Sequence, residues 1–347
     1  MKFDHRHYVS ILKGKRAEFP ALGLINSKNG ITPLLEAIPS KPAIQIPQGM
    51  AAQWPNDNPY FIDFQFFDDL EDNPTPEDHP LRLCFADVAA RDQLAIPVTG
   101  LSRSPSYQTA VQYVVAEQGN GLLLRLIPDD FEDVDDLEAT LDGIPGVFGV
   151  ERSEIDLLID LGSVVGVSAG TVAQMYRADI DLIPSLGEWR TLTVASSAFP
   201  LGLAPLARDQ WNPSPRVEWR GWRQIVAGAK RPSRLPAYGD YTIAHPNLPP
   251  EGRATILAQL RYATPDNWII WKGRNVFTDP DGFDQFYAIC ADLVERDEYR
   301  GPDFSQGDAD IQEKANNVGG PGSAETWRRI GTNHHIETVL DQIANLP

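Results

Sequence analysis

The sequence has few cysteines, no long apolar run and no secretory signal, and each shortage excludes a class of protein. Its 347 residues include two cysteines, Cys84 and Cys290, which are too far apart for a metal motif and too few for a disulfide framework. No stretch of 18 apolar residues is present, so we expect no transmembrane helix. Residues 1–7 lack the apolar core of a signal peptide, and we therefore expect a cytoplasmic protein.

Positive charge is also scarce, because 30 lysines and arginines are outnumbered by 48 aspartates and glutamates, for a net charge of −18. Nonspecific coating of nucleic acid needs clustered Lys and Arg, so this activity is excluded, whereas a local basic pocket inside an acidic shell is not. The G-x-S-x-G elbow of α/β-hydrolases is missing, and neither a P-loop nor a G-x-G-x-x-G motif follows a strand-like segment. None of these motifs is therefore available to indicate a type of reaction.

The sequence does contain a regular series of short apolar runs, most of them separated by helical patterns. The eight runs cover residues 8–13, 31–36, 60–65, 95–100, 122–127, 155–162, 191–197 and 235–243. Their mean spacing is (235 − 8)/7, or about 32 residues, which is the length of one strand–helix unit. Near-continuous apolar strands suit a parallel sheet, and eight such units predict an α/β fold of the (β/α)8 TIM-barrel type.

The alternation stops after the eighth run. Apolar residues in 254–262 and 268–272 flank a Thr-Pro-Asp-Asn turn at 264–267, which predicts an antiparallel hairpin. Helical patterns follow at 283–296, 308–316 and 324–344. We therefore predict a barrel over residues 1–243 and, over residues 244–347, a C-terminal extension of hairpin and helices packed on the barrel.

Charged side chains occur near the carboxyl ends of most predicted strands, where this fold carries its chemistry. In an eight-stranded barrel such groups converge within about one ligand's width. The set comprises Lys13, Lys15, Glu36, Asp63, Arg125, Asp160 and Asp240. Charged side chains are seldom buried unpaired, so the set predicts a ligand, a metal or a network of salt bridges.

These three interpretations use overlapping residues. A phosphate or carboxylate, which suits the bidentate geometry of Arg, is predicted to bind Lys13, Lys15 and Arg125, and Asp63 is a further ligand-binding candidate. Mg²⁺ or Mn²⁺, which prefer oxygen ligands, is predicted to bind Glu36, Asp63, Asp160 and Asp240. The catalytic candidates among the acids are Glu36, Asp160 and Asp240. In the structural alternative, the charges neutralise one another, Arg125 with Asp160 or Asp63 and Lys13 with Glu36.

The last helical pattern adds one more catalytic candidate, His335, which directly follows His334. Adjacent residues on a helix point about 100° apart, so the two histidines do not chelate one metal well. In one interpretation His335 reaches the barrel mouth as an acid or base. In the other, the two histidines form a packed or capping pair.

Two segments near the N-terminus carry a specific residue pattern. Residues 8–18 (YVSILKGKRAE) and 31–36 (ITPLLE) resemble the Y-x-P-x-L-K-x-K-x-x-E and I-x-P-L-x-E segments of the bacteriophage T4 beta-protein family, with Ser10 in place of the usual Pro. Further similarity occurs at 239–241, 261–262 and 327–336. The positions that the resemblance carries over, with roles unassigned, are Lys13, Lys15, Glu18, Glu36, Asp240 and His335. The resemblance implies a phage or defence context and no particular reaction.

Together these features predict a barrel protein of a phage or bacterial conflict context. We expect it to act on or bind a phosphate-containing small molecule or nucleotide at the strand ends, with Mg²⁺ or Mn²⁺ as a candidate cofactor. If it is an enzyme, the expected activity is that of a hydrolase or phosphodiesterase. The alternative is a non-catalytic module that holds a partner protein or a signal nucleotide in phage defence or counter-defence. Neither interpretation involves a membrane.

Overall fold

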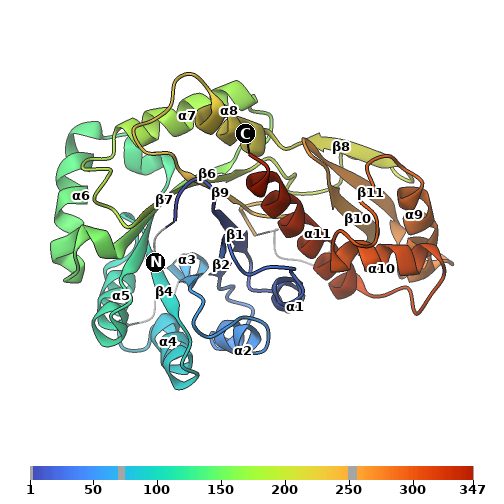
Figure 1. Ribbon diagram of the computed structural model, residues 1–347. Coiled ribbons are helices and arrows are strands. Elements are labelled where there is room, and N and C mark those ends of the chain that lie inside the picture. The colour runs from blue at the N-terminus through green and yellow to red at the C-terminus, as the bar shows by residue number, and fades with distance from the viewer. Residues whose placement is uncertain (1–2, 69–74, 249–255, 347) are drawn as a thin grey trace.

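The computed structural model describes residues 3–68, 75–248 and 256–346, and its larger sheet is a closed barrel (Figure 1). Eight parallel strands form the barrel in the order β1-β2-β3-β4-β5-β6-β7-β9. They are β1 (Tyr8–Leu12), β2 (Ile31–Glu36), β3 (Tyr60–Asp63), β4 (Ala95–Thr99), β5 (Leu122–Leu126), β6 (Ile155–Ser163), β7 (Thr191–Ser197) and β9 (Ala237–Asp240). Each overlaps one predicted apolar run, so the predicted (β/α)8 TIM-barrel-like fold is confirmed.

Helices surround the barrel and connect its strands (Figure 1). They are α1 (Glu18–Gly23), α2 (Gln45–Ala51), α3 (Gln65–Asp68), α4 (Pro80–Ala90), α5 (Pro105–Gln118), α6 (Val134–Phe148), α7 (Ala169–Asp181) and α8 (Val217–Ala227), with short 3-10 turns η1 (Pro128–Phe131) and η2 (Arg152–Glu154). Local sequence sets where some of them begin. The Ser104 hydroxyl accepts the Tyr107 N–H at 3.3 Å, and Pro105 occupies the first helical position of α5.

The smaller sheet is antiparallel and has the order β10-β11-β8. Its hairpin, β10 (Leu257–Ala263) and β11 (Asn267–Asn275), confirms the predicted one. The third strand, β8 (Trp211–Pro215), comes from the connection between β7 and α8 and pairs along the free edge of β11. Sequence analysis missed β8 because two of its five residues are prolines, which strands tolerate mainly at edges.

The C-terminal helices are η3 (Gly282–Asp284), α9 (Gln285–Val294), α10 (Gln306–Ala315) and α11 (Ala324–Ala344). The bounds of α11 are those predicted. This helix packs against α1 and β1 on one side and against β10 and α10 on the other, so it joins the barrel to the smaller sheet (Figure 1). Its residues from Ile330 to Val339 are all buried for this reason.

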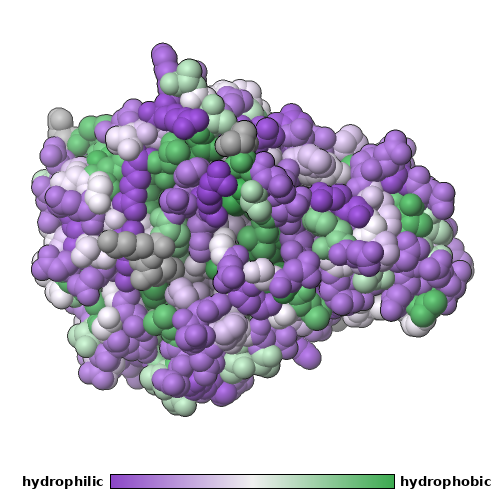
Figure 2. Space-filling view, viewed as in Figure 1, coloured by the Kyte–Doolittle hydropathy of each residue, from purple (hydrophilic) through white to green (hydrophobic). Residues whose placement is uncertain are grey.

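The barrel interior is filled by side chains rather than open. Its core contains Val9, Ile11, Leu34, Phe61, Ile96, Val98, Leu123, Leu158, Ala195 and Tyr241. A second core lies between the strands and the surrounding helices. Figure 2 shows hydrophilic residues over most of the visible face of the C-terminal part. Within the described part of the chain, none of the helices has the length and apolar character needed to cross a membrane.

Candidate functional site

The barrel interior ends in a layer of charged side chains at the carboxyl ends of the strands. Each follows an interior apolar residue by two positions, and side chains alternate along a strand, so both face the interior. The pairs are Ile11 and Lys13, Leu34 and Glu36, Phe61 and Asp63, Leu123 and Arg125, and Leu158 and Asp160. The five charged residues, which we call the charged cluster, are each at most 3 % exposed.

Arg125 is the hub of the charged cluster, and all five of its N–H groups donate hydrogen bonds. Its Nη1 donates to Glu36 Oε1 at 2.9 Å and to Asp63 Oδ2 at 2.6 Å. Its Nε and Nη2 donate to Asp160 Oδ2 at 2.9 and 2.6 Å, and Nη2 also donates to the Tyr241 hydroxyl. Burial opposes the charge, but Tyr241 and the three carboxylates outweigh burial and raise the pKa of Arg125. Arg125 therefore has no donor left for a phosphate.

Lys13 completes the environment of Glu36. Its ammonium group donates to Glu36 Oε2 and to the carbonyl oxygen of Pro246. Gly14 follows with a φ of +58°, and a Cβ there would lie 3.1 Å from the Glu36 carbonyl oxygen. This left-handed turn, which glycine adopts without strain, ends the strand alternation. The side chain of Lys15 consequently lies away from the barrel axis, in a pocket beside the mouth.

Asp63 brings a further cation, Arg103, to the edge of the charged cluster. The Arg103 guanidinium lies 3.5 Å from Asp63 Oδ1, which also accepts the Gln65 backbone N–H at 2.9 Å. Burial raises the pKa of Asp63, but Arg103 and Arg125 outweigh burial and bring it below its usual value. With Arg103 included, three cations face three carboxylates. The pairings of the structural alternative, Arg125 with Asp160 and Asp63 and Lys13 with Glu36, are therefore those observed.

The same contacts engage carboxylates that are predicted to bind Mg²⁺ or Mn²⁺. Among the residues that the structure describes, no group of three or more His, Cys, Asp or Glu side chains is arranged to hold a metal ion. Glu36, Asp63 and Asp160 turn their oxygens toward Arg125 instead. This arrangement does not fit the predicted metal, because the carboxylate oxygens are already engaged by the guanidinium group.

Asp240 does not join the charged cluster, because its side chain points to the outside of the barrel. The next residue, Tyr241, belongs to the interior core, so alternation turns Asp240 to the opposite face. There it accepts hydrogen bonds from the Tyr8 hydroxyl at 2.5 Å, the Tyr238 hydroxyl at 2.9 Å and His335 Nε2 at 2.8 Å. The expected convergence of Asp240 with the other carboxylates does not occur.

His335 is fully buried on α11 beside the barrel wall. Its Nδ1 accepts the indole N–H of Trp268 at 3.3 Å, so Nε2 carries the proton that is donated to Asp240. Burial lowers the pKa of His335, although Asp240 acts against the shift. His334 points elsewhere and contacts Asp308 at 2.8 Å. The two histidines are thus packed against different partners, and neither lines the pockets described next.

A small cavity of about 250 Å³ lies over the charged cluster. Its polar lining includes Arg103, Arg125, Asp160 and Tyr241. The Tyr241 hydroxyl donates to Asp160 Oδ2. Sequence analysis missed Tyr241 and chose its neighbour Asp240, because only the structure shows that Gly239 pairs with the interior residue Ala195 and that Tyr241 shares its side. Arg103 was missed because it follows β4 in a loop, where parity gives no direction.

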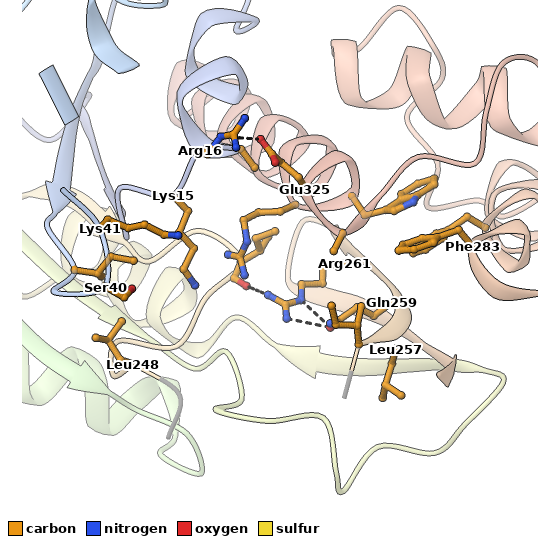
Figure 3. Close-up of a pocket in the computed structure, with 18 of the residues that line it drawn as sticks. Lys15, Arg16, Ser40, Lys41, Leu248, Leu257, Gln259, Arg261, Phe283 and Glu325 are labelled. Atoms are coloured by element: carbon orange, nitrogen blue, oxygen red, sulfur yellow. Dashed lines mark hydrogen bonds and ion pairs between the residues drawn. The ribbon is translucent and has the colours of Figure 1, made fainter. Parts of the chain in front are cut away.

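A larger pocket of about 810 Å³ lies beside the mouth, which we call the lateral pocket (Figure 3). It is bounded by the segments after β1, β2 and β9 and by parts of β10, η3, α9 and α11. Among the described residues, its lining contains one carboxylate, Glu325, and five cations: Lys15, Arg16, Lys41, Arg261 and Arg328. In a chain with a net charge of −18, this is a local concentration of positive charge.

The cations of the lateral pocket are weakly neutralised. Within the described part of the chain, the Lys15 ammonium has no hydrogen-bond or ion-pair partner. Arg261 donates to the Ile243 carbonyl at 2.6 Å and to Gln259 Oε1 at 3.0 Å, both uncharged (Figure 3). Arg328 reaches a carboxylate at 3.4 Å, that of Glu18. Sequence analysis identified Lys15 but not the two arginines, which come from the C-terminal part.

Burial and mutual repulsion both lower the pKa values of two of these cations. Burial and then the nearby Arg328 guanidinium lower the pKa of Lys15 to about 8. Burial and Arg328 also lower the pKa of Arg261. A lowered pKa means that the folded protein disfavours the positive charge. A bound anion would relieve this repulsion, so the lateral pocket is electrostatically suited to an anionic ligand.

Comparisons with known proteins test the resemblance to the beta-protein family. Among curated proteins, no sequence matches this chain. A family model described as Beta protein matches residues 8–341, a span that includes every barrel strand, the smaller sheet and most of α11. The resemblance seen in residues 8–18 and 31–36 is therefore confirmed, and the chain belongs to the Beta protein family.

Proposed function

We propose that the protein binds a phosphate-containing small molecule in the lateral pocket. Lys15, Arg261 and Arg328 contact the anionic group. The observation that carries this proposal is that, among the residues described by the structure, five cations and one carboxylate line this pocket of an acidic chain. Arginine suits phosphate because its planar N–H groups make paired, charge-assisted hydrogen bonds.

The dimensions of the lateral pocket support the same proposal. Its volume of about 810 Å³ lies in the range of small-molecule sites, which is roughly 300–1,000 Å³. The charged cluster is less suited to this role, because Arg125 has used all its donors and the cavity above it measures about 250 Å³. The predicted phosphate contact therefore moves from Arg125 to Lys15 and its neighbours.

Binding is better supported than turnover. Of the four catalytic candidates, Glu36, Asp160, Asp240 and His335, only Asp160 lines either of these pockets. A hydrolase or phosphodiesterase activity would have to begin from Asp160 and its hydrogen-bonded neighbour Tyr241. Binding without turnover corresponds instead to a module that holds a signal molecule, and the phage or defence context of the family resemblance belongs to this proposal.

Calorimetric titration with inorganic pyrophosphate tests the proposal. Pyrophosphate should bind the wild type, and its Kd for a Lys15→Met variant should be about tenfold higher, because one charge-assisted contact is lost. Lys230→Met is the matched control, since Lys230 is exposed and lies outside the lateral pocket, and it should bind as the wild type does. Absence of binding, or equal affinity in Lys15→Met, contradicts the proposal. Phosphorus NMR of bound nucleotides with and without Mg²⁺ reports any turnover.

A further inference from the structure

The lateral pocket has two chemically different ends. Figure 3 shows Lys15 and Lys41 on the side of the barrel and Phe283 on the opposite side, with Arg261 and Gln259 between them. Lys15 and Lys41 belong to the segments after β1 and β2, whereas Arg261, Arg328 and the aromatic end come from the C-terminal part. A ligand that spans the pocket therefore meets positive charge at one end and ring faces at the other.

The aromatic end is a row of nearly parallel rings. Phe286 stacks on Trp327 with ring centroids 3.8 Å apart and an angle of 6° between the planes. Phe283 continues the row, 6.4 Å from Phe286 and at an angle of 16°. Phe286 and Trp327 are buried, whereas Phe283 is only partly buried. Phe283 is thus the ring with surface left to contact a ligand.

The middle of the pocket provides groups that suit a polar linker. Gln259 uses its carbonyl oxygen to accept from Arg261, so its amide N–H groups are directed elsewhere. At the cationic end, Ser40 adds an exposed hydroxyl beside Lys41 (Figure 3). These groups are of the kind that bind sugar hydroxyls or the polar edge of a heteroaromatic ring.

We propose that the ligand of the lateral pocket is a nucleotide, with its base against Phe283 and its phosphates at Lys15, Arg261 and Arg328, beside Lys41. This inference rests on the proposed binding of a phosphate-containing molecule and specifies the class of that molecule. A base suits the aromatic end because every base has a flat π-face, and stacking on an aromatic side chain tolerates any base. A sugar phosphate or pyrophosphate would fill only the cationic end.

The test compares ligands that carry the two halves separately. Calorimetry is run with pyrophosphate, ribose 5-phosphate, a nucleoside and a panel of nucleoside diphosphates. We expect the tightest-binding nucleoside diphosphate to have a Kd at least about tenfold lower than that of pyrophosphate or ribose 5-phosphate, since base stacking adds to the phosphate contacts. This comparison uses the wild-type protein and needs no variant to fold.

Substitution of Phe283 locates the added affinity. Phe283→Leu should bring the nucleoside diphosphate down to the affinity of pyrophosphate and leave pyrophosphate binding unchanged. Phe277→Leu is the matched control, because Phe277 is 72 % exposed and outside the pocket, and it should behave as the wild type. If pyrophosphate binds as tightly as every nucleotide, this inference fails while the proposed function stands. If no phosphate compound binds, both fail.

Discussion

The charged cluster and the lateral pocket lie at the same end of the barrel and are both rich in cations, yet they differ in how those cations are paired. In the charged cluster, every N–H of Arg125 meets an oxygen, and with Arg103 at its edge three cations face three carboxylates. In the lateral pocket, Lys15 has no partner in the described part of the chain, and Arg261 donates only to uncharged oxygens.

This difference separates a structural role from a binding role. A buried charge with a full set of partners is stable without a ligand, and removing one partner leaves the others uncompensated. A half-buried cation among other cations is held against repulsion, which an anion relieves. The presence of charge at a barrel mouth is therefore a weaker indication of a ligand than a local excess of one sign.

The largest expected effect is on stability in the charged cluster. Arg125→Met removes the cation that three carboxylates share, so we expect the free energy of unfolding to fall by about 3–5 kcal/mol. Urea denaturation followed by circular dichroism measures the loss. Arg208→Met, at an exposed arginine, is the control and should unfold at the wild-type urea concentration. A variant at Arg125 as stable as this control would remove the contrast between the two regions.

The second largest expected effect is a loss of stability in acid, through Asp63 of the charged cluster. Arg103 and Arg125 hold the pKa of Asp63 below its usual value despite burial, so Asp63 binds its proton less readily in the folded state than in the unfolded state. Its contribution to stability is present above the unfolded pKa, near 4, and is lost as the pH falls through the folded pKa. Thermal unfolding between pH 2.5 and pH 5 should show a smaller decrease of Tm for Asp63→Asn than for the wild type. The exposed Asp297→Asn should retain the full decrease.

In the lateral pocket, alkaline pH should weaken ligand binding through Lys15. The pKa of Lys15 is lowered to about 8, so the ammonium loses its proton as the pH rises through this value. We expect phosphate-ligand affinity to fall by up to about tenfold between pH 7 and pH 9, because an uncharged amine lacks the ionic attraction. Calorimetry at fixed ionic strength measures the change. Lys15→Arg, which keeps its charge, should show a flatter profile, and identical profiles would contradict the assignment.

The smallest expected effect is on stability in the lateral pocket. Because the folded state disfavours the Lys15 charge, Lys15→Met should leave the Tm at pH 7 equal to that of the wild type or slightly above it. Differential scanning calorimetry measures this. A marked decrease in Tm would show that Lys15 has a structural role like that of Arg125, and the two regions would no longer differ in kind.

Much of the fold was predictable because it depends on local periodicity. The eight apolar runs overlap the eight barrel strands, and the helical pattern at 324–344 matches α11. The third strand of the smaller sheet, β8, was not predictable, because its prolines weaken the strand pattern and its pairing partner β11 lies about 50 residues later. The hydrogen bonds of such an edge strand are made with β11, so its local sequence alone does not indicate it.

The candidate site was predictable in part for the same reason. Lys13, Glu36, Asp63, Arg125 and Asp160 each share the parity of an interior residue, and all five converge. Asp240 has the opposite parity and faces His335 instead. Arg261 and Arg328 belong to β10 and α11, and no local pattern indicates that these elements lie beside Lys15.

By itself, the sequence determined the eight strand–helix units and the ring of charge at their carboxyl ends, because alternation within a strand is a short-range property. Only the tertiary structure decided which of those charges neutralise one another and which remain in excess. The reason is physical: neutralisation depends on distances between side chains from separate elements, and α11 and β10 bring two arginines to Lys15 across more than 200 residues of chain.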